Sequence, residues 1–278
     1  MTRLVFEEVS KRILFWCRLR RNLSAYGFFL ACVLVGLVAQ FIDGPLGMAY
    51  GVNCNTFLLT LGITPVFACA SVKPAEVFTA AVSGIAHWKM GNVDRKFMFS
   101  MAVPGVVGGV AGAFVLSHFA DNKFILPIVS VYLMGMGGFI IFKALRKKID
   151  GPENAHRVVP LGLVGGFLDS IGGGGWGPVV TSTLIAGGKE VRIAIDSVNI
   201  AEFFVNLSQV LTFVLMLGPK MQEQSNQLLV IIGGLIVGGV IAAPVAAYVC
   251  KRIPPKKLMF VVGAAIIALS LRNIAVTF

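Results

Sequence analysis

The chain has 278 residues, of which 56% are hydrophobic and only 13% are charged, and its formal net charge is +11. Because a soluble globular domain carries roughly 25% charged residues, this composition argues against a soluble fold. The basic residues gather beside apolar segments, in residues 1–22, 89–96, 143–157 and 251–257. That distribution is typical of membrane orientation and not of nucleic-acid binding, and it places all four clusters, with the N-terminus, in the cytoplasm.

The predicted elements are apolar helices along the whole chain, which indicates an all-α polytopic membrane protein. The apolar runs are 26–42, 46–61, 75–86, 97–117, 124–142, 158–168, 178–187, 203–218, 227–249 and 258–271. A full crossing needs about 20 apolar residues, and only some of these runs are that long. We divide the chain into an N-terminal cytoplasmic or interfacial segment (1–23), a first transmembrane repeat (24–145), a cytoplasmic linker (146–157) and a second repeat (158–278). The number of full crossings in residues 24–90 stays open.

The two repeats are visible as internal similarity. At an offset of 126, GLVAQFIDGPLGMAYG (36–51) matches GLVGGFLDSIGGGGWG (162–177), and 15 of 45 positions from residue 36 to 80 are identical. Asp43 pairs with Asp169 and Glu76 with Glu202, which apolar composition does not explain. VVGGVAGA (106–113) matches IVGGVIAA (236–243) at an offset of 130. The basic loops change places between the halves, which favours inverted-topology repeats.

Four consecutive glycines interrupt the second repeat at its first element. Residues 158–168 and 174–187 are each too short to span, so we predict a re-entrant hairpin of two half-helices whose tip is 169–175. Residues 47–51 repeat a weaker version of this tip. Glycines allow a sharp turn with exposed amide groups, and the following half-helix directs its positive end to the same point. Two facing tips would bind an anion, whereas Gly105, Gly108, Gly109, Gly112, Gly234, Gly238 and Gly239 have the spacing of close helix packing.

Ionisable residues inside apolar helices are candidates for coupling transport to a proton or sodium ion. They are Asp43, Glu76, Asp169 and Glu202. Asp43 and Asp169 are better explained as caps of the half-helices that follow them. Lys73 can pair with Glu76 at i,i+3, either as a structural salt bridge or as a proton-linked pair.

Polar residues near the tips could bind an oxyanion or instead bond to the backbone, and the sequence leaves both readings open. The predicted substrate-binding set is Gly47, Asn53, Asn55, Ser71, Lys73, Gly173, Gly174, Gly175, Thr181, Ser182, Ser197 and Asn199. The five cysteines and three histidines are scattered. They indicate neither a metal site nor a catalytic constellation, so we expect no metal, no cofactor and no enzymatic activity.

Several motifs in this order resemble the sulfite exporter TauE/SafE family. They are the glycine-rich break, ACAS (68–71) and AIDS (194–197), VSGIAHWKMGNVD (82–94) and PGVVGGVAGA (104–113). The resemblance implies a secondary carrier that moves sulfite or small organosulfonates across the bacterial inner membrane, often as an exporter. It places Gly47, Gly173, Ser71 and Ser197 near the substrate path. The alternatives are an anion channel, or a carrier of another small carboxylate or oxyanion; the partners would be this anion, membrane lipid and a second copy in a homodimer.

Overall fold

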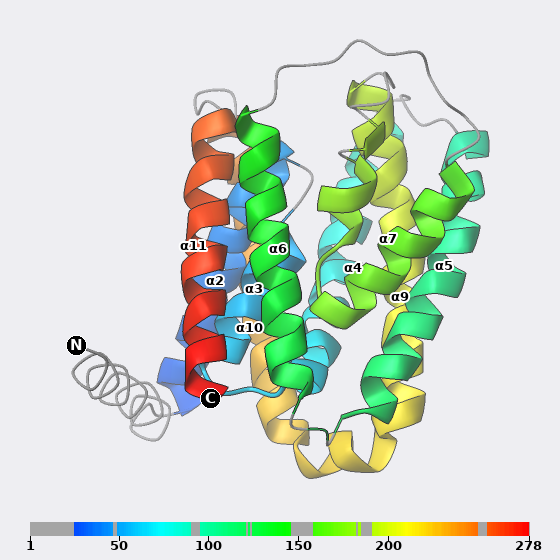
Figure 1. Cartoon of the computed structure of the whole chain (residues 1–278). Coiled ribbons are helices and arrows are strands. Elements are labelled where there is room, and N and C mark those ends of the chain that lie inside the picture. Colours follow the sequence, from blue (N-terminus) through cyan, green and yellow to red (C-terminus); the bar gives the residue numbers. More distant parts are fainter. Residues whose placement is uncertain are drawn as a thin grey trace.

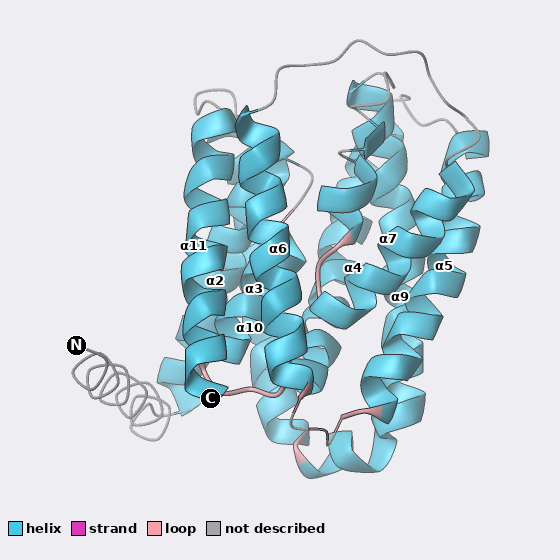
Figure 2. Ribbon diagram, in the orientation of Figure 1, coloured by secondary structure: helices cyan, strands magenta, loops and turns pink. Residues whose placement is uncertain are grey.

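The computed structural model describes residues 25–46, 49–89, 95–120, 122, 124–145, 158–181, 183–184, 191–249 and 255–277. Within these ranges the chain forms helices joined by short connections and contains no strand (Figure 2). The helices are α2 (Ala25–Leu46), α3 (Tyr50–Thr60), α4 (Pro65–Lys89), α5 (Arg95–His118), α6 (Ile125–Leu145), α7 (Val158–Gly172), the π-helix η2 (Trp176–Thr181), α9 (Val191–Glu223), α10 (Ser225–Val249) and α11 (Pro255–Thr277). The predicted N-terminal segment and linker lie outside the described residues.

Most of these helices are suited to a membrane. Six of the described helices, α2, α4, α5, α6, α9 and α10, are long and apolar enough to cross one. Their outer faces expose large apolar side chains such as Phe99, Val103 and Phe142, which suits contact with lipid. By contrast, α7 has 15 residues and measures about 22 Å, which is less than the roughly 30 Å of a hydrocarbon core. The predicted all-helical polytopic class is confirmed.

The helices begin at the spacing of the sequence repeat. Tyr50 and Trp176 begin α3 and η2, and Pro65 and Val191 begin α4 and α9, so both pairs are 126 residues apart. Later in the chain, α5 and α10 begin at residues 95 and 225, and α6 and α11 at residues 125 and 255, with a spacing of 130. These are the two offsets at which the sequence matches itself.

Packing between helices follows the same correspondence. α2 packs along α10, and its counterpart α7 packs along α5, the counterpart of α10. The corresponding pairs α4 with α9 and α6 with α11 also pack on one another. In Figure 1, α6 and α11 run in opposite directions, as two inverted copies would. Each half therefore contributes its first helix to the neighbourhood of the other half.

Glycines make the closest of these packings. A Cβ on Gly108 would overlap the Leu163 backbone of α7, and one on Gly238 would overlap the Val33 backbone of α2. This agrees with the packing role predicted for the small-residue stripes of α5 and α10. The two equivalent interfaces thus depend on the same residue type.

The direction of α2 bears on one expectation from the sequence, the cytoplasmic position of the N-terminus. At the upper end of the bundle in Figure 1, α4 and α6 end and α5 and α11 begin, and in the sequence these helix ends adjoin three of the basic clusters. By contrast, α2 begins at the lower end. The fourth cluster, residues 1–22, precedes α2 and lies outside the described residues. A single crossing by α2 would separate that cluster from the other three, so the cytoplasmic N-terminus stays a prediction.

Candidate functional site

The two helix breaks meet near the centre of the bundle. Gly173 follows α7 with φ at +68°, a left-handed conformation that favours glycine. The buried Asn55 of α3 donates its Nδ2 hydrogen to the Gly172 carbonyl at 2.6 Å. Gly174 packs so closely on the backbone of Gly51 and Val52 that a Cβ has no room. Residues 49–52 and 172–175, which we call the two tips, are therefore in direct contact.

Asp169 holds the second tip in place. Its Oδ1 accepts hydrogen bonds from the amides of Gly175, at 2.8 Å, and Trp176, at 3.1 Å. A carboxylate at the beginning of a helical turn satisfies free amides and interacts well with the helix dipole. This geometry fits the capping interpretation. It also means that these two amides already have an anionic partner inside the protein.

Lys73 joins the two halves through a buried ion-pair network. Its side chain is 0% exposed. Its Nζ lies 2.6 Å from Glu76 Oε2 on the same helix, 2.6 Å from Asp169 Oδ2 on α7 and 3.2 Å from Asn206 Oδ1 on α9. A lysine has three hydrogens to donate, so all are used. The i,i+3 pair with Glu76 was predicted, whereas the pair with Asp169 was not.

Two polar residues of α9 that the sequence analysis did not single out complete this network. Gln209 donates its Nε2 hydrogen to Asp169 Oδ2 at 3.0 Å, and Asn206 accepts from Lys73. Glu202, Asn206 and Gln209 follow one another at spacings of four and three, which puts them on one face of the helix. That spacing of polar residues within an apolar helix is the signal that could have found them.

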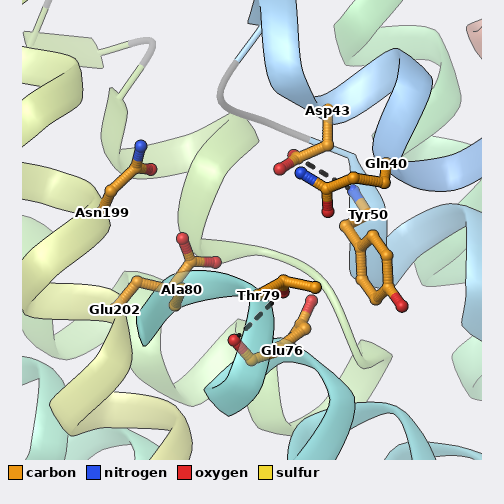
Figure 3. A pocket seen from close by; sticks show the side chains of 8 residues that line it. All are labelled: Gln40, Asp43, Tyr50, Glu76, Thr79, Ala80, Asn199 and Glu202. Atoms are coloured by element: carbon orange, nitrogen blue, oxygen red, sulfur yellow. Dashed lines mark hydrogen bonds between the residues drawn. The ribbon is translucent and has the colours of Figure 1, made fainter. Parts of the chain in front are cut away.

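Beside the network lies a small pocket of about 30 Å³, room for about one water molecule (Figure 3). Its lining comes from both halves: Gln40, Asp43, Tyr50, Glu76, Thr79, Ala80, Asn199 and Glu202. We call it the acidic pocket because three of the eight residues carry carboxyl groups. The structure thus brings Asp43, Glu76 and Glu202 together, whereas Asp169, on α7, bonds to the second tip. Gln40, Tyr50 and Thr79 were not among the predicted site residues.

The other predicted binding residues fall into three groups. Asn53 and Ser71 bond to carbonyls of the preceding turn, Ala49 and Phe67 respectively, which is the backbone alternative left open by the sequence. Ser197 is buried on α9, two residues before Asn199, which faces the acidic pocket. Gly47 and Ser182 lie outside the described residues.

The buried polar groups without a hydrogen-bond partner among the described residues include three donors on α6, η2 and α9. They are Tyr132 Oη, Thr181 Oγ1 and Asn206 Nδ2. The Tyr132 ring packs against Gly172, and its Oη lies next to Gly175. Buried groups of this kind are normally paired, and an exception calls for an explanation. All three can donate a hydrogen.

A polytopic helical bundle with a buried charge network between two interrupted helices has the architecture of a membrane transporter. The family model of the sulfite exporter TauE/SafE matches residues 32–273. The chain is also 40% identical over 248 residues, 86% of its length, to the probable membrane transporter protein YtnM of Bacillus subtilis strain 168, and covers 80% of that protein. The chain belongs to the TauE/SafE family. No solved structure matches it significantly.

Proposed function

We propose that the chain is a secondary transporter that moves sulfite or a small organosulfonate across the bacterial inner membrane by alternating access, as an exporter. The two halves act as inverted repeats, and the region where their tips meet is the substrate site. α7 and η2 form a re-entrant hairpin in this proposal, because α7 is too short to span. The family and the relative support a transporter; the substrate, direction and mechanism are our inference.

One observation carries the choice of an oxyanion. Tyr132 Oη, Thr181 Oγ1 and Asn206 Nδ2 are buried without a partner among the described residues, and Tyr132 Oη lies next to Gly175 of the second tip. A sulfite or sulfonate group has several oxygens that accept hydrogen bonds, so it would satisfy such donors. Lys73 supplies a fixed positive charge beside one of these residues, Asn206.

Asp169 indicates how the site accepts an anion. Its carboxylate now bonds to Lys73 and to the amides of Gly175 and Trp176. An oxyanion would take the same kind of partners. We infer that substrate competes with Asp169 for them, and that this exchange loosens the contact between the two halves. Pro74, next to Lys73 inside α4, has no amide hydrogen and weakens the helix at this point.

The experiment that tests the proposal is uptake of radiolabelled sulfite into proteoliposomes. Wild-type protein is expected to give saturable uptake. Ser197→Ala and Gly173→Leu should abolish or strongly reduce it, since the tip has no space for a side chain at Gly173. Gly135→Leu is the matched control, because nothing lies near a Cβ at that position on α6. Normal uptake by both site variants would contradict the proposed site.

A further inference from the structure

The acidic pocket offers few hydrogen-bond donors: its lining has the side-chain amides of Gln40 and Asn199 and two hydroxyl groups. Lys73 directs all three of its hydrogens to Glu76, Asp169 and Asn206. The Tyr50 hydroxyl donates to the Leu235 carbonyl at 3.0 Å, outside the pocket lining. The Thr79 hydroxyl donates to the main-chain carbonyl of Glu76 at 3.2 Å. Tyr50 and Thr79, which line the pocket, and Lys73, which bonds to the lining residue Glu76, are therefore already committed.

Acceptors are abundant in the same space. Gln40 is only 6% exposed, and its Oε1 has no hydrogen-bond partner among the described residues. Figure 3 shows its amide pointing into the pocket next to Asp43. Ionised carboxylates can only accept hydrogen bonds. With Asp43, Glu76 and Glu202 all ionised, the lining would therefore hold many more acceptors than donors.

The charges around the acidic pocket are also unbalanced, because carboxyl groups outnumber basic groups. Lys73 pairs with Glu76 and Asp169. Across the part of the chain that the structure describes, no basic group lies within 4 Å of Asp43 or Glu202. Asp43 and Glu202 are half-buried, and a charge that is partly removed from water without a partner favours its neutral form. Asp43 keeps one bond, from the Tyr50 amide at 3.3 Å.

We propose that the acidic pocket is a proton-binding site in which Asp43 and Glu202 take up protons. Each proton is transferred from a hydronium ion to a carboxylate oxygen, so one O–H bond of the hydronium breaks, one O–H bond of the carboxyl group forms, and a water molecule is released. A protonated carboxyl group is a donor, so it supplies the partner that Gln40 Oε1 lacks. Two neighbouring carboxyls from different helices are a common way to hold a proton, because both cannot easily be ionised together.

The other charged and titratable groups around the pocket reinforce this assignment. Tyr50 of α3 and Glu76 of α4 line it, Lys73 and Asp169 lie behind Glu76 in the ion-pair network, and Cys54 of α3 interacts with Tyr50 and Glu76. The region thus holds four carboxyl groups and one lysine, and two of these carboxyl groups pair with that lysine. Since Glu76 belongs both to the pocket and to the Lys73 network, protons in the pocket change the electrostatics of the tips. That coupling role rests on the proposed function, whereas proton binding itself does not.

The test is infrared spectroscopy of the purified full-length protein, which detects the carbonyl band of protonated carboxyl groups. We expect this band at neutral pH, reduced in Glu202→Gln and in Asp43→Asn. Glu223→Gln, an exposed position at the end of the same helix as Glu202, is the matched control and should leave the band unchanged. Size-exclusion chromatography checks that each variant is folded. A band absent at neutral pH, or unaffected by both pocket variants, would overturn the proposal.

Sodium is the alternative ligand, and the same measurement distinguishes it. Replacing choline chloride by sodium chloride at constant pH should leave the band unchanged if the pocket binds protons. Loss of the band on adding sodium would overturn the proposal in favour of a sodium site.

A transport measurement separates this inference from the proposed function. Glu202→Gln should keep the exchange of labelled for unlabelled sulfite and lose accumulation driven by a pH gradient. Wild-type exchange without any response to a pH gradient would contradict proton coupling while leaving the transporter intact. If wild-type protein exchanges no sulfite at all, the proposed substrate is wrong, and the infrared result still decides the proton site.

Discussion

Lys73 illustrates how much a single buried side chain can determine. Its three hydrogen bonds join α4, α7 and α9, so the only cation of the network connects the two halves of the molecule. Burying such a group is unfavourable unless every charge is compensated. We therefore expect its removal to affect the whole fold as well as any substrate site.

Lys73→Met tests this at the residue scale. The variant leaves Glu76 and Asp169 buried without their cation, and breaking a buried pair in this way costs about 3–5 kcal/mol. Thermal unfolding in detergent should show a large loss of stability. Adding Asp169→Asn should recover part of that loss, whereas Lys96→Met, at an exposed position on α5, should change little. If the double variant loses as much stability as Lys73→Met and Asp169→Asn lose in sum, the two residues are not energetically coupled.

Two tyrosines provide a second comparison at this scale. Tyr50 Oη donates to Leu235, so Tyr50→Phe should destabilise the protein by about 1 kcal/mol. Tyr132 Oη has no partner among the described residues, so Tyr132→Phe should leave stability unchanged.

Transport should respond to the Tyr132→Phe change instead. If Tyr132 binds an oxyanion, its loss should raise the KM for sulfite by about tenfold, the equivalent of one hydrogen bond of about 1.4 kcal/mol to a charged group. Equal KM values for wild type and Tyr132→Phe would remove this residue from the site.

At the scale of elements, the repeated helix interfaces depend on glycine. A Cβ at Gly108 would overlap the backbone of Leu163 and force α5 away from α7. Gly135, on α6, has nothing within 4 Å of the same position. Because both glycines lie in transmembrane helices, a comparison of their substitutions separates the effect of packing from the effect of helix propensity.

We expect Gly108→Ala to destabilise the protein by about 1–3 kcal/mol, as overpacking does. Gly135→Ala should be neutral or stabilising by about 0.5–1 kcal/mol, because alanine is the better helix former. Thermal unfolding of the two variants measured side by side checks this. Equal changes in stability for Gly108→Ala and Gly135→Ala would show that α5 and α7 can move apart without destabilising the protein.

The elements were largely predictable from the sequence, because apolar runs and paired glycine motifs are local signals. The 126-residue offset anticipated the spacing between the beginnings of α3 and η2 and between those of α4 and α9. It did not anticipate that α2 has 22 residues and its counterpart α7 only 15. In the first half, α2 is therefore longer than the half-helix that the repeat predicts. Ala49, with φ at 121°, occupies a glycine-favouring conformation where the repeat has Gly175.

The site was less predictable, because its contacts join residues far apart in the chain. Sequence spacing could suggest Lys73 with Glu76, three residues away, but not Lys73 with Asp169, 96 residues away. For Asn55 the sequence left both an anion and the backbone open as partners, and it could not name the Gly172 carbonyl to which this side chain bonds. Which donors lack partners, such as Tyr132 Oη, depends on packing and has no sequence signature.

At the scale of the whole molecule, orientation in the membrane is the first property to test. In Figure 1, α5 begins at the upper end of the bundle, and the connection between α5 and α6 lies at the lower end. The three basic clusters at the upper end predict that this end is cytoplasmic.

Single cysteines at these two ends, in a cysteine-free background, make the prediction specific. In intact spheroplasts, a membrane-impermeant maleimide should label Asn122→Cys and spare Lys96→Cys until the membrane is permeabilised. The opposite pattern would invert the orientation, and equal labelling of both would contradict a membrane-spanning α5.

The central claim is that the two halves form a carrier with one alternating site for a small sulfur oxyanion. After it releases substrate, a carrier must return its binding site to the other side of the membrane. When the empty site returns slowly, substrate that binds on the inside accelerates this return. The most direct measurement is therefore entry of labelled sulfite into proteoliposomes with and without unlabelled sulfite inside. We predict that internal sulfite accelerates entry and that the rate saturates with external sulfite. Entry that rises linearly with concentration and ignores internal sulfite would contradict the account and indicate a channel.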